Sequence, residues 1–328
     1  MNEKKAQITV GFPVYNGEKF IKEAIDSILN QTFKNFELII SDNASTDNTE
    51  LICRDYAAQD PRIRYYRNEK NLGAAKNYNR VFELSESEFF KWANHDDIHD
   101  IQFLEKCLKA LEKNSSAILA FPKSILIDEK GQHIEKLFYD LDINYTSSYK
   151  RIKRYYECSW TKKIAGSKQK RTGVWMPIYG LIRAEALRKT NLIGNYISSD
   201  TILLEELALL GNFCLVPEYL FFKREHPQRS VRENLSFKER MLWFDTSKKS
   251  ELVFPNWRIL CEQFNVINSN SIRINIYDKL LCHVEIAKYL RLKWRVLCLE
   301  LFFNIVVIVS KFLPNSIKLK ERLPNVWW

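Results

Sequence analysis

The amino-acid sequence alternates between short apolar runs, which are typical of buried strands, and stretches whose apolar residues recur at helical spacing. Residues 8–12 are the first apolar run, and a helical pattern follows between residues 17 and 30. Further strand-like runs occupy 36–40, 63–66, 89–92 and 117–121, separated by helical patterns at 49–56, 74–84 and 101–111. Because helices are the usual crossovers between parallel strands, we predict an α/β fold with a mostly parallel central sheet flanked by helices.

The alternation does not continue to the end of the chain. At 328 residues the chain is long enough for one large domain with an appendage. From about residue 232 the pattern is helical, without a second set of strands. We therefore predict a domain over 1–230, divided into halves 1–121 and 122–230, and a C-terminal helical extension over 231–328.

Polar residues follow three of the expected strands, at 13–17, 41–47 and 94–97. Ligands of parallel sheets bind at the carboxyl ends of the strands, so these loops are the place to look for chemistry. Adjacent Asp96 and Asp97 suit a hard divalent cation, although Asp also caps helices such as the one expected near residue 100. Asp42 is able to accept hydrogen bonds from a base or a ribose hydroxyl, or to form an Asx turn.

The same segments resemble a known family. Residues 8–17, 27–33, 37–49, 68–77 and 92–98 are similar to the opening of family 2 glycosyltransferases of the GT-A fold, of the type that builds bacterial surface polysaccharides. The resemblance is close over about 7–115 and looser to about 226. It implies an inverting enzyme that moves a sugar from a nucleoside-diphosphate donor, a UDP-sugar, to a hydroxyl group of a glycan acceptor carried on a lipid.

The resemblance also implies roles for individual residues. It makes 1–121 the nucleotide-binding half and 122–230 the acceptor-binding half, and it implies Mn²⁺ or Mg²⁺ on Asp96 and Asp97. Asn94 stands where the family has the first acid of its metal motif, which removes one negative charge and predicts weak metal affinity. The donor-binding residues implied are Pro13, Val14, Tyr15, Asp42, Gly73, Lys76, Asn94, Asp96, Arg224 and His226.

The catalytic base implied by the resemblance is Asp200, at the start of a helical pattern over 200–210. A carboxylate there is able to take the proton of the acceptor hydroxyl as its oxygen attacks the anomeric carbon. The alternative for Asp200 is a helix N-cap.

Other function classes fit the sequence less well. Nucleic-acid binding is suggested by the excess of 50 Lys and Arg over 40 Asp and Glu and by a basic stretch with aromatic residues at 150–171. We predict that this stretch is a loop. No nucleic-acid-binding motif accompanies these features. A sugar nucleotidyltransferase would need a Gly-rich loop with a lysine, which the sequence lacks. A non-catalytic nucleotide-binding relative remains a further alternative.

The cellular location is inferred from three features. Seven cysteines without a CxxC pair and a charged N-terminus without an apolar signal segment predict a cytoplasmic protein. Residues 296–310 are apolar with basic flanks, but a membrane span needs about 20 residues. This segment either packs on the core, spans a membrane, or lies in an anionic membrane interface, which would make the protein peripheral on the inner face of the cell membrane.

Overall fold

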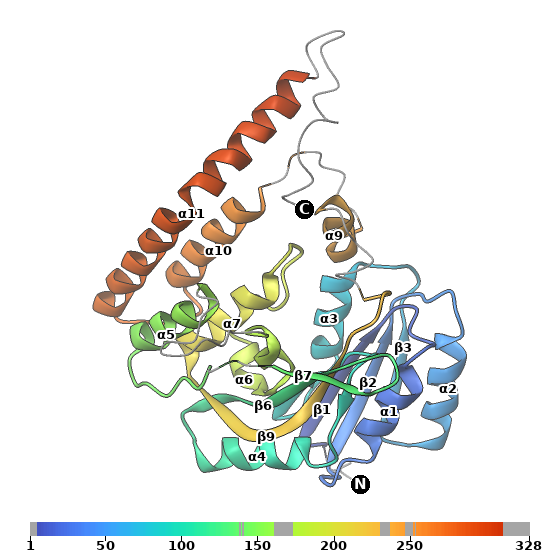
Figure 1. The fold of residues 1–328 in the computed structure, drawn as a ribbon. Coiled ribbons are helices and arrows are strands. Elements are labelled where there is room, and N and C mark those ends of the chain that lie inside the picture. Colours follow the sequence, from blue (N-terminus) through green and yellow to red (C-terminus); the bar gives the residue numbers. More distant parts are fainter. Residues whose placement is uncertain are drawn as a thin grey trace.

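The structure is a computed structural model that describes residues 5–137, 139, 141–160, 173–229, 237–246, 252 and 254–310. Within these ranges the strands form one mixed sheet in the order β3-β2-β1-β4-β8-β6-β9-β5, with β7 paired to β6 (Figure 1). Helices cover this sheet and continue into a long C-terminal helix that projects away from it. The α/β prediction is therefore confirmed.

The first half of the sheet follows the predicted alternation closely. Its four strands, β1 to β4, pair in parallel, with β1 between β2 and β4 and with β3 outside β2. Its elements are β1 (Ile8–Val14), α1 (Ile21–Leu29), β2 (Phe36–Asp42), α2 (Thr49–Gln59), β3 (Ile63–Arg67), α3 (Ala74–Glu83) and β4 (Phe89–Trp92). The parallel strands direct their carboxyl ends, and the polar loops after them, to one edge.

The second half of the sheet is mixed. Strand β8 runs antiparallel to both β4 and β6, whereas β6 and β9 are parallel. The short strands β5 and β7, which the sequence patterns did not predict, add antiparallel pairs to β9 and β6. The elements are β5 (Ile98–His99), α4 (Phe103–Lys113), β6 (Ala117–Ile127), β7 (His133–Lys136), α5 (Ser148–Trp160), η1 (Met176–Tyr179), β8 (Leu181–Arg183), α6 (Ala184–Leu187), α7 (Ser199–Leu210) and β9 (Asn212–Arg224).

Helix α5 (Ser148–Trp160) covers residues 150–160 of the basic loop expected over 150–171. Its side chains hold α7 in place: Arg151 donates to the carbonyl oxygens of Ala208 and Leu209, each at 2.7 Å, and Tyr155 donates to that of Thr201. A guanidinium on the last carbonyls of a helix satisfies groups that lack partners inside the helix and complements its dipole. The loop prediction is wrong for 150–160, because these basic and aromatic residues pack on α7. The remainder, 161–172, lies outside the described residues.

The described C-terminal part consists of α9 (Phe237–Phe244), α10 (Pro255–Asn268) and α11 (Ile276–Ser310). Helix α10 packs against α7 and α11, and α11 packs against α5. Among the described helices, α11 included, we find none whose length and apolar content would suffice to cross a membrane.

Candidate functional site

Hydrogen bonds join the loop after β1 to the loop after β2. The backbone amide of Asn16 donates to Ser45 Oγ at 2.9 Å, and the amide of Gly17 donates to Thr49 Oγ1 at 2.8 Å. Of the three residues predicted in the first loop, Pro13 and Val14 are buried in β1, whereas Tyr15 is 42% exposed. Tyr15 is therefore the one of the three whose side chain reaches the surface.

Asp42 is fully buried at the end of β2. One carboxylate oxygen accepts from the amide of Ser45, and the other accepts from Tyr65 Oη at 2.9 Å and Arg67 Nη1 at 2.7 Å. Since both oxygens are engaged and neither reaches the surface, the geometry does not support the predicted direct contact of Asp42 with a base. It makes Asp42 the residue that positions Tyr65 and Arg67.

Asn77 on α3 hydrogen-bonds to the end of β2, to the residue after β3 and, at 3.5 Å, to the carbonyl oxygen of Val14 at the end of β1. Its side-chain oxygen accepts from Ser41 Oγ at 2.7 Å and from Asn68, and its amide donates to the carbonyl oxygen of Ser41. We did not predict a role for Asn77, although it ends the 68–77 segment that carries the resemblance.

Gly73 and Lys76 begin α3. Gly73 has a φ of 84°, which favours glycine, and a Cβ there would lie 2.6 Å from the carbonyl oxygen of Phe244 on α9. Lys76 is exposed. The predicted donor loop is thus covered at Gly73 by a C-terminal helix and leaves the Lys76 ammonium accessible.

Asp97 lies in a buried polar cluster after β4. Its carboxylate accepts from Lys223 Nζ at 2.9 Å, from the amide of Arg224 at 3.0 Å and from Asn94 Nδ2 at 2.8 Å. Burial alone would lower the pKa of Lys223, but Asp97 raises it above its ordinary value, so the ammonium is charged. The prediction that Asp97 binds a metal is not supported by this geometry, because its oxygens are already occupied.

Asn94 is held from two sides. It donates to Asp97 and accepts from Tyr78 Oη at 2.6 Å, and it is buried. In this position it orders the loop between β4 and Asp96 without adding a negative charge.

Asp96 is the acid of this loop that faces the basic residues after β9. Its Oδ2 lies 3.0 Å from His226 Nε2. Burial raises the pKa of Asp96, but the Lys223 charge and the hydrogen bond from His226 outweigh burial and hold the pKa well below its usual range. Asp96 is therefore ionised in the folded protein.

Arg224, the last residue of β9, is buried. Its guanidinium is 1% exposed and donates to the carbonyl oxygens of Asp96 and Glu129, at 2.9 and 2.8 Å, and to the carboxylate of Glu23. With these donors engaged, the predicted contact of Arg224 with a diphosphate is not supported. Arg224 instead fixes the backbone that carries Asp96.

Asp96 and His226 carry the two kinds of donor atom that bind a divalent cation such as Mn²⁺, but in this structure Nε2 of His226 donates its proton to the Asp96 carboxylate. Carboxylate oxygen and imidazole nitrogen both bind Mn²⁺, and Nδ1 of His226 is buried without a hydrogen-bond partner in the described structure, which is unusual for a buried ring nitrogen. No group of three or more His, Cys, Asp or Glu that could hold an ion occurs among the residues described. A cation bound here would have these two side chains as protein ligands, and phosphate oxygens and water would have to supply the rest.

Asp200 lies in the first turn of α7 and is half-buried. Its Oδ1 accepts from the amide of Thr201 at 2.9 Å, and burial raises the pKa of its carboxyl group. Helix η1, which carries Tyr179, packs against both β4 and α7. The fold therefore brings Asp200 towards the β4 loop from more than 100 residues away.

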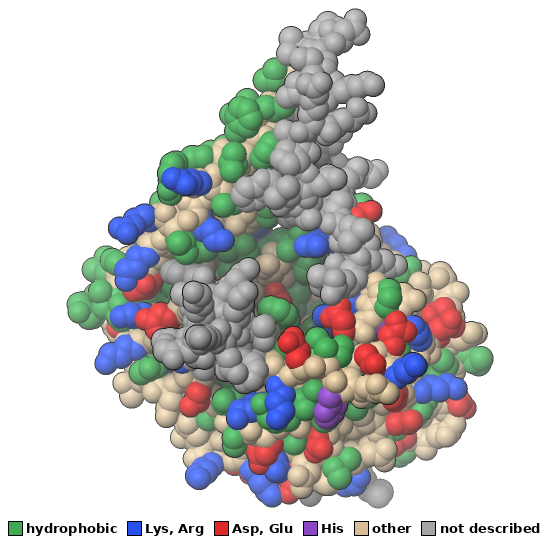
Figure 2. All heavy atoms as spheres, viewed as in Figure 1, with side chains coloured by type: hydrophobic (Ala, Val, Ile, Leu, Met, Phe, Trp, Pro, Cys, Tyr) green, Lys and Arg blue, Asp and Glu red, His purple; other side chains and the backbone are tan. Residues whose placement is uncertain are grey.

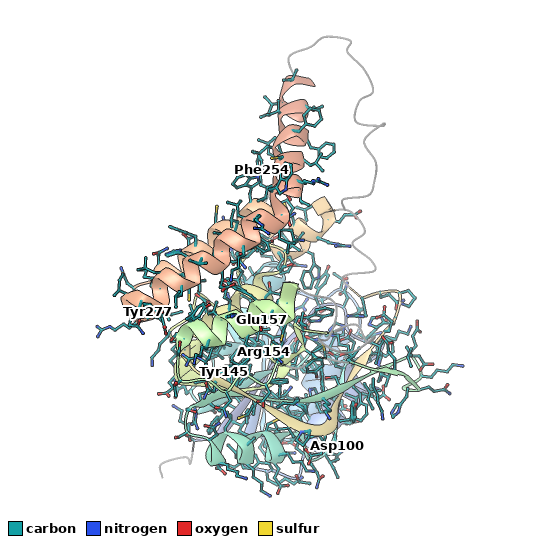
Figure 3. All side chains as sticks on the ribbon, turned by 60° about the vertical axis from the view of Figure 1, so that its left-hand side comes forward. Asp100, Tyr145, Arg154, Glu157, Phe254 and Tyr277 are labelled. Carbon is teal, nitrogen blue, oxygen red and sulfur yellow. The ribbon has the colours of Figure 1, made fainter. Side chains whose placement is uncertain are left out.

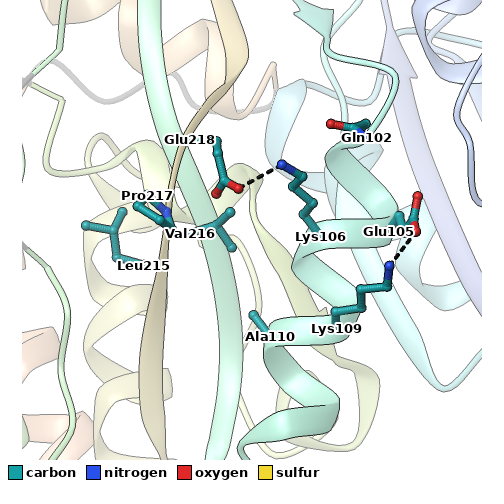
Figure 4. Close-up of a pocket in the computed structure, with 9 residues that line it drawn as sticks. All are labelled: Gln102, Glu105, Lys106, Lys109, Ala110, Leu215, Val216, Pro217 and Glu218. Carbon is teal, nitrogen blue, oxygen red and sulfur yellow. Dashed lines mark hydrogen bonds and ion pairs between the residues drawn. The ribbon is translucent and has the colours of Figure 1, made fainter.

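One hollow of the described surface lies away from these loops. It measures about 320 Å³ and lies between α4 and β9 (Figure 4). Its charged residues are paired with each other, Lys106 with Glu218 and Lys109 with Glu105. None of the residues predicted from the sequence lines it, so it carries no functional assignment.

Comparison with known proteins matches residues 9–188 to the model of the Glycosyl transferase family 2. The chain is 32% identical over 154 residues to an uncharacterized glycosyltransferase of Methanocaldococcus jannaschii, covering 46% of this chain and 51% of that protein. It is 32% identical over 139 residues to the minor teichoic acid biosynthesis protein GgaB of Bacillus subtilis, covering 40% of this chain and 15% of GgaB. The matches thus span about half or less of these relatives.

Two solved structures resemble the fold. S. aureus TarS in complex with UDP-GlcNAc matches with a TM-score of 0.55 and 16% identity, over 80% of this chain and 66% of that chain. The mannosyltransferase PcManGT from Pyrobaculum calidifontis, in complex with GDP-Man and Mn²⁺, matches with a TM-score of 0.50 and 14% identity, over 96% of this chain and 89% of the other. This likeness confirms the predicted GT-A fold.

Proposed function

Because this chain belongs to glycosyl transferase family 2, we propose that it is an inverting glycosyltransferase that moves a sugar from a nucleoside-diphosphate donor to a hydroxyl group of a glycan. The observation that carries the proposal is the contact of ionised Asp96 with His226 at the carboxyl end of β4. A carboxylate and an imidazole side by side suit a divalent cation that in turn holds a diphosphate.

The donor we propose is a UDP-sugar. The UDP-GlcNAc complex of a structural neighbour supports this choice, although another neighbour is in complex with GDP-Man. In this proposal Tyr15 and Lys76 contact the nucleotide directly, because their side chains are exposed. Asp42 and Arg224 act as positioning residues, since their polar atoms are committed to other protein groups.

Mn²⁺ or Mg²⁺ would be held by Asp96 and His226. When bound, the ion supplies positive charge to the departing diphosphate. Asn94 and Asp97 keep the Asp96 loop in place through their hydrogen bonds, and Lys223 places a second positive charge near it.

Asp200 is the proposed general base. As the acceptor oxygen bonds to the anomeric carbon, the carboxylate takes the hydroxyl proton, and the bond from that carbon to the diphosphate oxygen breaks on the opposite side with its electron pair. One displacement of this kind inverts the anomeric configuration. The raised pKa of Asp200 suits proton uptake near neutral pH better than an ordinary carboxylate does.

The acceptor we propose is a glycan on a lipid carrier, in the synthesis of a surface polysaccharide at the inner face of the cell membrane. The name of the B. subtilis relative, a teichoic acid biosynthesis protein, supports the polysaccharide class. In this scheme residues 1–121 bind the donor, 122–230 bind the acceptor, and 231–328 form a helical extension.

Calorimetric titration with UDP, GDP and TDP, each with and without Mn²⁺, tests the donor site. We expect UDP to bind more tightly than the others and only with the metal. Asp200→Asn should keep this binding and lower turnover by about 10²–10⁴-fold, while Asp55→Asn on the exposed face of α2 should alter neither. Metal-dependent binding without turnover in the unmodified chain would favour a non-catalytic relative, a reading that Asn94 at the first motif position also fits.

A further inference from the structure

The distal part of α11 has the reverse of the polarity of a helix in water. Between Val296 and Val309, the polar side chains Glu300 and Asn304 are buried, at 9% and 6% exposure. Every side chain described there as at least partly exposed is apolar, with Phe302 at 58% and Ile305 at 56%. Surface helices of water-soluble proteins place charged and polar residues outward. In this part of α11 the polar side chains face the protein and apolar side chains face the solvent.

Hydrogen bonds to α10 explain why the polar side faces inward. The Glu300 carboxylate accepts from the amides of Asn256 and Trp257, at 3.0 and 3.3 Å, and Asn304 donates to the carbonyl oxygen of Glu300 at 2.7 Å. An acid at the amino end of α10 satisfies its unpaired amides and complements its dipole. The inward face of α11 is thus specified by Glu300 and Asn304 together with the buried Leu297, and the exposed apolar residues point away from the protein.

The exposed apolar residues extend around the helix. At 3.6 residues per turn, Leu299 and Leu301 are separated by about 200° around the axis, and both are exposed. Figure 2 shows apolar side chains gathered along the upper part of the projecting helix, and Figure 3 shows side chains radiating from it. A single contact with another helix would cover one narrow stripe.

Basic and aromatic residues directly precede this apolar part. Arg291, Trp294 and Arg295 are exposed, and the Arg295 guanidinium lies 5.4 Å from the centre of the Trp294 ring. Arginine and tryptophan are typical of the boundary between lipid headgroups and hydrocarbon, where the ring is half-immersed and the cation meets phosphate.

We propose that the distal part of α11, residues 296–310, docks this protein on a lipid bilayer with anionic headgroups, with Arg291, Trp294 and Arg295 at the headgroup level. Fifteen helical residues extend about 22 Å, enough to reach into one leaflet of a hydrocarbon layer about 30 Å thick. The bilayer accounts for apolar exposure around the helix and for the adjacent positive charge, whereas a second copy of the chain would bring like charges together.

Docking of α11 on a bilayer agrees with the proposed lipid-linked acceptor. The docking proposal does not depend on that acceptor. Helix α9, which covers Gly73, and the distal part of α11 both lie above the sheet in Figure 1. A membrane bound by α11 would therefore lie on the side of the molecule where α9 covers the proposed donor loop.

Flotation of the full chain with vesicles tests the proposal, using phosphatidylcholine alone or mixed with phosphatidylglycerol. We expect the chain to bind the anionic vesicles more tightly than the neutral ones. Phe302→Asp with Ile305→Asp should lower binding at least about tenfold, because apolar burial is lost. Arg291→Ala with Arg295→Ala should lower binding to anionic vesicles by about 30-fold and to neutral ones far less.

Leu51→Asp on α2 is the matched control, since Leu51 is 70% exposed and lies on another element. It should leave vesicle binding unchanged, and thermal unfolding should show all variants folded. The proposal is overturned if the unmodified chain does not bind vesicles, or if the Phe302 and Ile305 changes leave binding intact. Self-association in lipid-free solution that these changes abolish, without vesicle binding, would assign the surface to a second copy. The vesicles contain no donor or acceptor, so a failure of the proposed glycosyl transfer would not affect this result.

Discussion

The variant Asp97→Asn tests whether Asp97, the second acid of the loop after β4, has a structural role or binds a metal. The native carboxylate is fully buried and accepts three hydrogen bonds, from Lys223, Asn94 and the amide of Arg224. Asparagine keeps the size but offers one acceptor oxygen, and it removes the negative charge opposite the Lys223 ammonium. The buried lysine is then left without its partner.

The expected loss of stability follows from that unpaired charge. Removing one partner of a buried ion pair costs about 3–5 kcal/mol. For a domain of 150–250 residues, 1 kcal/mol corresponds to about 2–4 °C, so the melting temperature should fall by about 6–20 °C. Where the variant is still folded, metal-dependent binding of UDP should persist, because Asp96 and His226 are unchanged.

Thermal unfolding and UDP calorimetry on Asp97→Asn and Asp96→Asn make the comparison. Asp96 is 11% exposed at its side chain, and its loss should remove metal-dependent binding with a smaller loss of stability. Adding Lys223→Met to Asp97→Asn should restore part of the melting temperature, because the ammonium that lost its ion-pair partner is then removed, while Asp96 keeps its contact with His226. An Asp97→Asn protein with an unchanged melting temperature but no metal-dependent UDP binding would refute this reasoning and make Asp97 a ligand.

Three further changes probe the packing around the site. Burial raises the pKa of Glu205 from 4.5 to about 8, so the stability that the protonated side chain contributes is complete below about pH 4.5 and is lost as the pH rises through 8. Glu205→Gln should make the melting temperature less dependent on pH and should raise it above pH 8. A variant with no gain above pH 8 would contradict the raised pKa. Gly73→Ala should cost about 1–3 kcal/mol in denaturant unfolding, because of its positive φ and the nearby Phe244 carbonyl; an unchanged midpoint would mean that α9 does not pack there. Arg151→Met should cost about 1–3 kcal/mol, since the α7 carbonyls lose their donor, and a neutral result would show that water replaces it.

Apart from the short strand β5, the order of strands and helices over residues 8–121 was predictable because its signals are local. An apolar run or a helical repeat depends on neighbouring residues, and the expected elements agree with the structure to within a few residues at their ends. The polar loops after β1, β2 and β4 were readable in the same way. The family was also predictable, because the resemblance lies in contiguous segments of the sequence. The match over residues 9–188 confirmed that family.

Which polar groups are available for chemistry depended on the tertiary structure. Asp97 and Arg224 look like a ligand and an anion-binding residue in the sequence, yet both are buried by partners that include residues far along the chain, Lys223 for Asp97 and Glu23 for Arg224. Composition does not show such pairing, because burial and partner geometry arise only when distant segments pack together.

The C-terminal helix illustrates the same division. The sequence determined that residues 296–310 are apolar and helical, but core packing, an interface and a span were all compatible with that pattern. The tertiary structure decided which side faces the protein, because the Glu300 carboxylate caps α10 and turns the apolar residues outward. The rotation of a helix about its own axis decides which side chains face the protein. Only the contacts with neighbouring elements determine that rotation.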